Sequence, residues 1–147
     1  MKTILIYSDC PFFGGSENVI PVILKDKKLN KSFNIVFIFR FRDDYIKGLN
    51  FKIDISEFNI QQITYNFSDF VEKYLKMLRL SRMIGFVEMP LMVIDVLLQL
   101  PKFREINPDL IYINNGGYPG ARTCKSAVIT AKLVGIKNIL FMVNNIA

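Results

Sequence analysis

Five short apolar runs along the chain have the composition of buried β-strands. Four of them are nearly continuous in β-branched and aromatic residues, whereas the third is weaker and more alternating. Continuous runs are typical of parallel strands that helices cover on both faces. We therefore predict strands over residues 3–8, 34–39, 60–65, 110–114 and 138–143.

The segments between these strands have the spacing and the end signals of helices. Ser68 suits an N-cap, and the apolar residues from Phe70 to Leu78 recur on one helix face. Pro90 suits a first helical position, Pro101 should end a helix, and Gly135 suits the position just after one. These signals predict helices over residues 16–28, 68–85, 90–100 and 121–134.

Pro21 bears on where the first helix begins. A start at Ser16 would place Pro21 beyond the first turn, where its missing N–H removes a hydrogen bond. With Asn18 as the N-cap, Pro21 falls within the first turn and costs little. We therefore expect a late start or a kink.

The alternation of strands and helices predicts a doubly wound α/β domain. We expect a Rossmann-like parallel sheet of about five strands in a three-layer sandwich, formed as one domain over residues 1–147. The last predicted strand ends at Val143, close to the end of the sequence. Two interpretations follow: a small open α/β module, or the truncated first domain of a larger protein, which we favour.

The composition and net charge of the chain limit the kinds of partner that it can bind. The 19 Lys and Arg residues exceed the 13 Asp and Glu residues, which gives a net charge of +6. Such a charge favours phosphates, anionic lipids or acidic substrates without choosing among them. The chain has no nucleic-acid-binding motif and no basic run, so we expect no nucleic-acid partner.

Residue types and motifs that the chain lacks exclude further kinds of site and protein. The chain has no His, which removes the commonest zinc ligand and the commonest acid–base group near neutral pH. Cys10 and Cys124 lack CxxC spacing and indicate reduced thiols of a cytoplasmic protein. The apolar N-terminal run is too short for a signal peptide, and no run is long enough to span a membrane. We expect neither a metal site nor a resident cofactor.

A pair of glycines follows the first predicted strand. Ligands of open α/β sheets bind outside the carboxyl ends of the strands, near the switch in strand order. Glycine amides and the free N–H groups of a helix start can together hold an anion. Gly14, Gly15, Ser16 and Glu17 are therefore predicted to bind a phosphate group. The alternative is a turn without a ligand, in which the Glu17 carboxylate itself satisfies those donors.

This glycine segment is not one of the common nucleotide-binding fingerprints. It lacks GxGxxG, and no Gly-Lys-Ser/Thr follows it. NAD-dependent and ATP-hydrolysing functions are therefore not expected.

A second polar loop follows the fourth predicted strand, with the sequence NNGGYPG. The first and fourth strands usually flank the switch point, so the two loops are expected to face each other across a crevice. Asn side chains and a Tyr ring can hydrogen-bond to a sugar and stack on it. The alternative is a long connector whose Asn residues cap their own turns. The predicted binding residues are Asn114, Asn115, Gly116, Gly117 and Tyr118.

The second predicted helix is basic. Lys73, Lys76, Arg79 and Arg82 recur every three residues and drift around the helix, which favours a solvated surface. The alternative is a basic and aromatic surface that makes a peripheral contact with an anionic membrane. Its apolar part would come from Phe12, Phe13, Met83 and Phe86.

Three segments in this order resemble the N-terminal Rossmann-like domain of GT-B glycosyltransferases, particularly the family-four-type retaining enzymes. The segment FFGGSENVIPVIL is similar to that family's GG-A/S-E segment after the first strand. NPDLIYINNGGYPG resembles its Pro-Asp-aliphatic strand and the glycine-bearing loop beyond it. VGIKNILFMVNNIA resembles the strand that normally ends in Val-His-Asn/Asp. The resemblance spans nearly the whole chain.

The resemblance implies a function and partners. In that family two Rossmann-like domains face each other across a cleft, and the C-terminal domain holds most of the nucleotide-sugar donor. The N-terminal domain supplies the site for the acceptor, here a cell-surface glycan or lipid-linked acceptor. It implies a cytoplasmic enzyme of polysaccharide biosynthesis, peripheral at the inner face of the membrane. The chain alone, without the missing C-terminal domain, would be inactive.

The resemblance also assigns residues. Gly14 and Gly15 would approach the donor diphosphate, and Glu17 would order the helix start. Residues 114–118 would line the acceptor side. Asn144 falls at the catalytic position that is usually His, where it can hydrogen-bond but cannot act as a base.

Two rival interpretations stay open. One is a non-catalytic α/β binding or regulatory module, such as a flavodoxin-like receiver. A receiver would need an acidic cluster after the first strand, where Asp9 stands alone in the sequence, and a Lys after the fifth. The other is an inactive glycosyltransferase homologue, for which Asn144 is the best argument.

Overall fold

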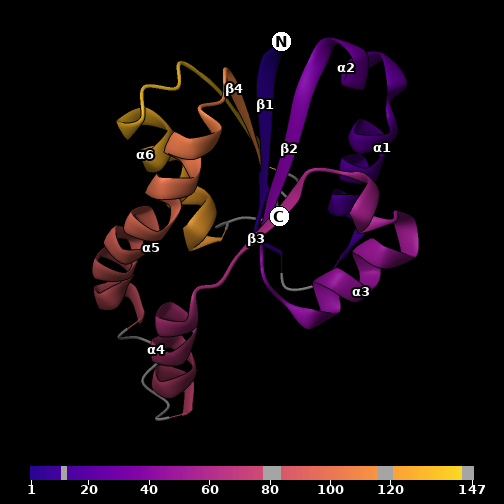
Figure 1. Ribbon diagram of the computed structural model, residues 1–147. Helices are drawn as coiled ribbons and strands as arrows, with labels where there is room; N and C mark the ends of the chain where they lie inside the picture. Colours follow the sequence, from indigo (N-terminus) through magenta and orange to yellow (C-terminus); the bar gives the residue numbers. More distant parts are fainter. Residues whose placement is uncertain (11–12, 78–83, 116–120, 144–147) are drawn as a thin grey trace.

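The computed structural model describes residues 1–10, 13–77, 84–115 and 121–143 of the chain. Its strands form one parallel sheet in the order β3-β2-β1-β4-β5, with helices on both faces (Figure 1). This confirms the Rossmann-like, doubly wound fold. All five predicted strands are present, as β1 (Lys2–Ser8), β2 (Phe33–Arg40), β3 (Ile60–Ile63), β4 (Leu110–Asn115) and β5 (Asn138–Val143).

The helices form two layers around the sheet, which Figure 1 shows nearly edge-on. One layer contains α1 (Val19–Lys25), α2 (Lys27–Ser32) and α3 (Asp43–Lys52), with the short 3-10 helices η1 (Gly15–Asn18) and η2 (Ile55–Glu57) in its connections. The other contains α4 (Asn66–Met77), α5 (Ile84–Ile106) and α6 (Arg122–Leu133).

The two faces of the sheet have separate hydrophobic cores. Leu5 and Tyr7 of β1 belong to the core under α5 and α6, whereas Ile6 belongs to the core under α1 and α3. Successive side chains of a strand point to opposite faces, so a strand covered on both sides must be apolar throughout. This explains why the strand runs are continuous in the sequence.

Strand β1 lies at the centre, where the strand order reverses. It pairs with β2 on one side and β4 on the other, and Ser8 is in register with both Phe39 and Asn114. The carboxyl ends of these three strands therefore meet at one edge of the sheet. Ligands of open α/β sheets bind at such a switch point.

The first predicted helix is divided into shorter elements. Asn18 precedes α1, and Pro21 lies in its first turn, which confirms the late start. The prediction of one helix over residues 16–28 is wrong, because the chain turns at Asp26. Its side chain accepts hydrogen bonds from the N–H groups of Lys28 and Leu29 and so starts α2.

The next two helix predictions were wrong at their ends. Helix α4 starts at Asn66, and Ser68 is not its N-cap, because its Oγ donates to buried Asp95 at 2.8 Å. Helix α5 continues through both Pro90 and Pro101. It packs along α6, and this tertiary packing outweighs the local cost of the two prolines.

Helix α3 was not predicted, because its apolar residues recur only weakly at helix spacing. The end of α6 was predicted correctly. Gly135 has φ of 85°, and the N–H groups of Gly135 and Ile136 bond to the carbonyls of Lys132 and Ala131. This is the Schellman arrangement, which glycine favours. Within the described residues, no helix is both long enough and apolar enough to cross a membrane.

Candidate functional site

Glu17 is the buried centre of the glycine segment. It belongs to η1, yet its side chain has no exposed surface. Ser8 Oγ donates to Glu17 Oε2 at 2.9 Å, and the Tyr45 hydroxyl donates to the same oxygen. Asn114 Nδ2 donates to Glu17 Oε1 at 2.6 Å. One carboxylate therefore joins β1, α3 and β4 to the segment that carries the glycines.

The surroundings of Glu17 change its acidity. Burial raises the pKa of Glu17 above its ordinary value of 4.5, although the hydrogen bonds from Tyr45, Ser8 and Asn114 act in the opposite direction. Burial, reinforced by the neighbouring Glu17, also raises the pKa of Tyr45 well above its ordinary value. The Tyr45 hydroxyl therefore stays protonated and remains a donor to the carboxylate.

Gly14 and Gly15 lie in the loop that follows the carboxyl end of β1. Gly14 is half-buried and Gly15 is exposed. A Cβ atom added at Gly15 would meet no other heavy atom within 4 Å. Neither residue has a positive φ, so the backbone itself does not require glycine here. The missing side chain leaves open space above the backbone at this edge.

Glu17 does not cap the start of its own helix. Asn18, the N-cap of α1, also makes no side-chain capping bond. In the described part of the chain, the Glu17 carboxylate therefore accepts from side chains and not from the free N–H groups of the helix start, whereas the turn without a ligand stays an untested alternative. The reason is tertiary, because donors from β1, α3 and β4 occupy both carboxylate oxygens.

Asn114 brings the two predicted loops together. It is fully buried at the end of β4, and its Nδ2 also lies 3.4 Å from the carbonyl oxygen of Ser16. Its Oδ1 accepts from the Tyr112 hydroxyl at 3.4 Å. The side chain is therefore engaged within the protein and positions the glycine segment against β4.

Of the remaining predicted residues, the structure describes Asn115 alone. Asn115 is the last residue of β4. Gly116, Gly117, Tyr118 and Asn144 lie outside the described residues.

A buried charge cluster occupies the same edge and was missed from the sequence. Asp9, directly after β1, accepts from Arg40 Nη1 at 2.9 Å and from Thr123 Oγ1 at 2.6 Å on its Oδ2 atom. Its Oδ1 lies 3.6 Å from Arg42 Nη2. Arg40 also donates to Asp69 of α4. These contacts link β1 to β2 and to the start of α6, and β2 to α4.

A second buried ion pair extends this cluster between the helices. Asp95 of α5 accepts from Arg122 Nε at 2.6 Å and from Ser68 Oγ at 2.8 Å. It therefore joins α4, α5 and α6. The sequence contained a signal for these groups, because Asp9 and Arg40 directly follow or end buried strands and must meet at the same edge.

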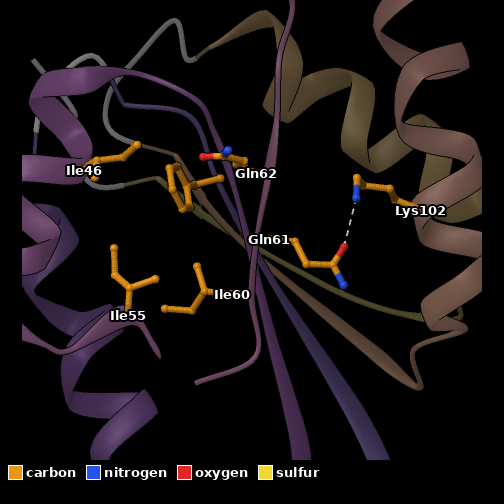
Figure 2. A pocket seen from close by; sticks show the side chains of 7 residues that line it. Ile46, Ile55, Ile60, Gln61, Gln62 and Lys102 are labelled. Carbon is orange, nitrogen blue, oxygen red and sulfur yellow. Dashed lines mark hydrogen bonds between the residues drawn. The ribbon is translucent and has the colours of Figure 1, made fainter. Parts of the chain in front are cut away.

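Two pockets lie away from these residues, and one of them is at the edge of the sheet. It has a volume of about 490 Å³ and wraps around β3, an outer strand of the sheet. Figure 2 shows Ile46, Ile55 and Ile60 on one side of β3, whereas Gln61 accepts a hydrogen bond from Lys102 on the other. A second pocket of about 340 Å³ lies at the amino end of β2. Neither of these two pockets is lined by the predicted site residues.

The described residues contain no group of three or more His, Cys, Asp or Glu side chains that could hold a metal ion. Comparison of the chain with protein-family models found no match. Searches of curated proteins and of solved structures found no match either.

Proposed function

We propose that this chain is the acceptor-side, N-terminal domain of a GT-B glycosyltransferase. The complete enzyme would transfer a sugar from a nucleotide-sugar donor to a cell-surface glycan or lipid-linked acceptor. The observation that carries the proposal is the hydrogen bond between Asn114 and Glu17, which brings the glycine segment against the end of β4. The two segments thus meet at the switch point, where ligands of such sheets bind.

The open surface at Gly15 supports a role in holding phosphate. A ligand can approach the backbone amides of Gly14 and Gly15 closely, because no side chain projects from them and Gly15 has free space around it. Preorganised amides stabilise the charge that develops on a leaving diphosphate. Ser16 completes this segment, and Glu17 serves as the positioning residue that keeps it in place.

The proposal assigns the other residues by their place. Residues 114–118 would line the acceptor side. Asn114 would act indirectly, through its hydrogen bond to Glu17. Asn144 would stand at the catalytic position after β5. The proposal places the enzyme in the cytoplasm, peripheral at the inner face of the membrane.

The proposal also needs a second domain that holds the donor. Strand β5 is an outer strand, and it exposes Leu140, Met142 and Val143. Strands of parallel sheets are normally covered on both faces. These side chains therefore offer a surface on which a further part of the protein can pack.

The receiver-like alternative has less support from the geometry. A receiver needs free carboxylates after β1, whereas Asp9 is bound to Arg40 and Thr123. Among the described residues of this edge, Asp9 is therefore already paired, which favours the proposal over a receiver.

A nucleotide titration tests the proposal on the chain itself. UDP and GDP, added in turn to the labelled chain, should shift the backbone amide NMR signals of Gly14 and Gly15. In the complete enzyme, Gly15→Val should abolish transfer, because the new side chain fills the space that the diphosphate needs. The open surroundings of Gly15 mean that this variant should still fold.

Asn59→Val is a matched control, since Asn59 is exposed just before β3 at the opposite edge of the sheet. It should leave the nucleotide shifts and transfer unchanged. A folded Gly15→Val enzyme that keeps full transfer would disprove the assignment of the glycine segment.

A further inference from the structure

Strand β3 turns one row of its backbone groups away from the sheet. In the described part of the chain it pairs with β2 only. The carbonyl oxygen of Asn59 accepts from the N–H group of Phe37 at 2.9 Å, and that of Ile63 accepts from Phe41 at 2.9 Å. Successive residues of a strand turn their N–H and C=O groups to opposite edges. Both backbone groups of Gln62 therefore point to the open edge, where they form a template for a further strand.

The sequence of β3 does not protect this edge. Natural sheets usually shield an outer strand with charged side chains, proline or a bulge. The segment from Asn59 to Thr64 contains neither a charged residue nor proline. Gln62 and Thr64 are exposed. The edge is therefore chemically able to accept a pairing strand.

A pocket of about 490 Å³ lies along the same edge. Ile46, Ile55 and Ile60 line it from the face of the sheet that α1 and α3 cover. Gln61 and Lys102 of α5 line it from the other face, as Figure 2 shows on the two sides of β3. One cavity can reach both faces only by passing the free edge of the strand. Its volume lies within the range of about 300–1,000 Å³ that is usual for ligand pockets.

The two sides of the pocket differ in chemistry. Three isoleucines make one side apolar, whereas Lys102 is the one charged residue among the described residues that line the pocket. Its Nζ donates to Gln61 Oε1 at 3.1 Å, and an ammonium group has two further N–H donors. Alternate side chains of a strand point to opposite faces. An added strand would therefore place an apolar side chain against the isoleucines and the next side chain, an acidic one, beside Lys102.

We propose that β3 binds an extended peptide segment of another protein as a further strand of the sheet. The backbone of the peptide pairs with Gln62, and its side chains alternate between apolar residues and an acidic residue that contacts Lys102. Main-chain hydrogen bonds supply the affinity of such complexes, and pockets for alternate side chains supply the specificity. This inference goes beyond the proposed sugar transfer and does not depend on it, because it involves neither the glycine segment nor Asn114.

Charge favours such a peptide over a second copy of the chain. Antiparallel pairing of two β3 strands about a twofold axis would keep both Lys102 side chains on one face of the joined sheet. Like charges at neighbouring positions destabilise a strand pair. The described lining residues include no carboxylate that could compensate.

An NMR titration of the full 147-residue chain tests the proposal. The probe is the blocked peptide acetyl-Thr-Val-Glu-Val-Thr-amide, added to about 5 mM because short peptides bind weakly. At saturation it should slow hydrogen exchange at the Gln62 amide at least about tenfold. The Gln61 amide, which faces β2, is the internal control and should keep its exchange rate. Replacement of Glu by Lys in the peptide should weaken binding at least about threefold.

Two N-methylated peptides distinguish strand pairing from simple apolar contact. Neighbouring residues of a strand turn their N–H groups to opposite edges. Methylation of the Glu nitrogen in one peptide and of the following Val nitrogen in the other should therefore abolish binding in one case and spare it in the other. Apolar contact alone would not produce this alternation.

Variants of the chain locate the site. Gln62→Pro removes the outward N–H group at a position where an outer strand tolerates proline, and it should abolish binding. Lys102→Glu should weaken binding of the Glu peptide and strengthen binding of the Lys peptide. Lys132→Glu makes the same charge change at an exposed position of α6 and should alter neither. Unchanged thermal unfolding would show that the variants fold, and the Lys102 pair decides the matter without Gln62→Pro.

Three results would overturn the proposal. One is a Gln62 amide that the peptide leaves unchanged, and another is an equal effect of the two N-methyl groups. The third is a concentration-dependent dimer in light scattering that Gln62→Pro abolishes, which would identify a second copy as the occupant. None of these results bears on nucleotide binding at the glycine segment, so the two proposals fail independently.

Discussion

The Nδ2 atom of Asn114 donates a 2.6 Å hydrogen bond to Oε1 of Glu17, although 97 positions separate the two residues in the sequence. Both side chains are fully buried. This hydrogen bond joins two side chains that are shielded from water. It links the loop after β1 to the end of β4 at the point where the strand order reverses.

Removal of the Glu17 carboxylate should destabilise the fold. Glu17→Ala leaves the buried donors of Ser8, Tyr45 and Asn114 without their acceptor and opens a cavity. We expect a loss of about 3 kcal/mol in the free energy of unfolding, measured by urea denaturation. Glu17→Gln should lose less, because its oxygen can accept from Asn114 while the hydroxyls of Ser8 and Tyr45 turn to accept from its amide. Equal losses in the two variants would contradict this account.

The same pair should differ in pH dependence. Burial raises the folded-state pKa of Glu17 above its ordinary value of 4.5, so the folded state binds this proton more tightly than the unfolded state. The contribution of this group to stability is complete below the unfolded pKa and is lost as pH rises through the folded pKa. Gln does not titrate.

The unfolding free energy of the wild type, relative to Glu17→Gln, should therefore fall as pH rises from 4.5 toward the folded pKa. The slope cannot exceed about 1.4 kcal/mol per pH unit for one proton. Urea midpoints of both proteins across this range measure it. Parallel pH profiles of the two proteins would show that the Glu17 pKa is not raised.

Arg40 should contribute far more to the free energy of unfolding than an exposed cation does. Its pair with Asp9 has side chains only 5% and 2% exposed, so Arg40→Met leaves a buried carboxylate without its main partner. We expect a loss of about 3–5 kcal/mol. Lys47→Met is the control, because Lys47 and Asp44 are 3.7 Å apart with side chains 78% and 79% exposed. It should stay within about 0.5 kcal/mol of the wild type.

The double variant Asp9→Asn/Arg40→Met removes both charges of the pair. It should recover part of the stability lost in Arg40→Met. An additive loss in the double variant would mean that the two side chains act independently.

The same change, Gly to Ala, should affect stability at Gly48 and not at Gly15. A Cβ atom at Gly48 of α3 would lie 2.4 Å from Phe13 Cβ, whereas one at Gly15 would meet nothing. Gly48→Ala should lower stability by about 1–3 kcal/mol despite the better helix propensity of Ala, because the overlap displaces Phe13 from Tyr45. Gly15→Ala should unfold at nearly the wild-type temperature. Thermal unfolding measures both, and a more stable Gly48→Ala protein would show that Phe13 moves at little cost.

The strands were predictable because their signal is local. A strand covered on both faces must be apolar at every position, and β1, β2 and β4 appear in the sequence as such runs. Helix ends were less predictable. Ser68 has the composition of a cap but bonds to Asp95, and α5 passes through two prolines because it packs on α6.

The amphipathic pattern of α4 was also visible in the sequence, but not which side of it would face outward. Periodicity identifies a helix face without stating what covers it. In the structure Phe70, Tyr74 and Met77 are exposed, because Ser68 and Asp69 anchor the other side to α5 and β2.

By itself, the sequence determined the five strands, the doubly wound class and the place of the glycine segment after β1, since each depends on residues close together in the chain. Only the tertiary structure decided what Glu17 and Asp9 do. Their partners come from other strands and helices, and the energy of a buried charge depends on which donors surround it. The sequence places Asp9 and Arg40 at the same edge of the sheet, but it does not show which donors surround each carboxylate, so their partners were decided only by the folded chain.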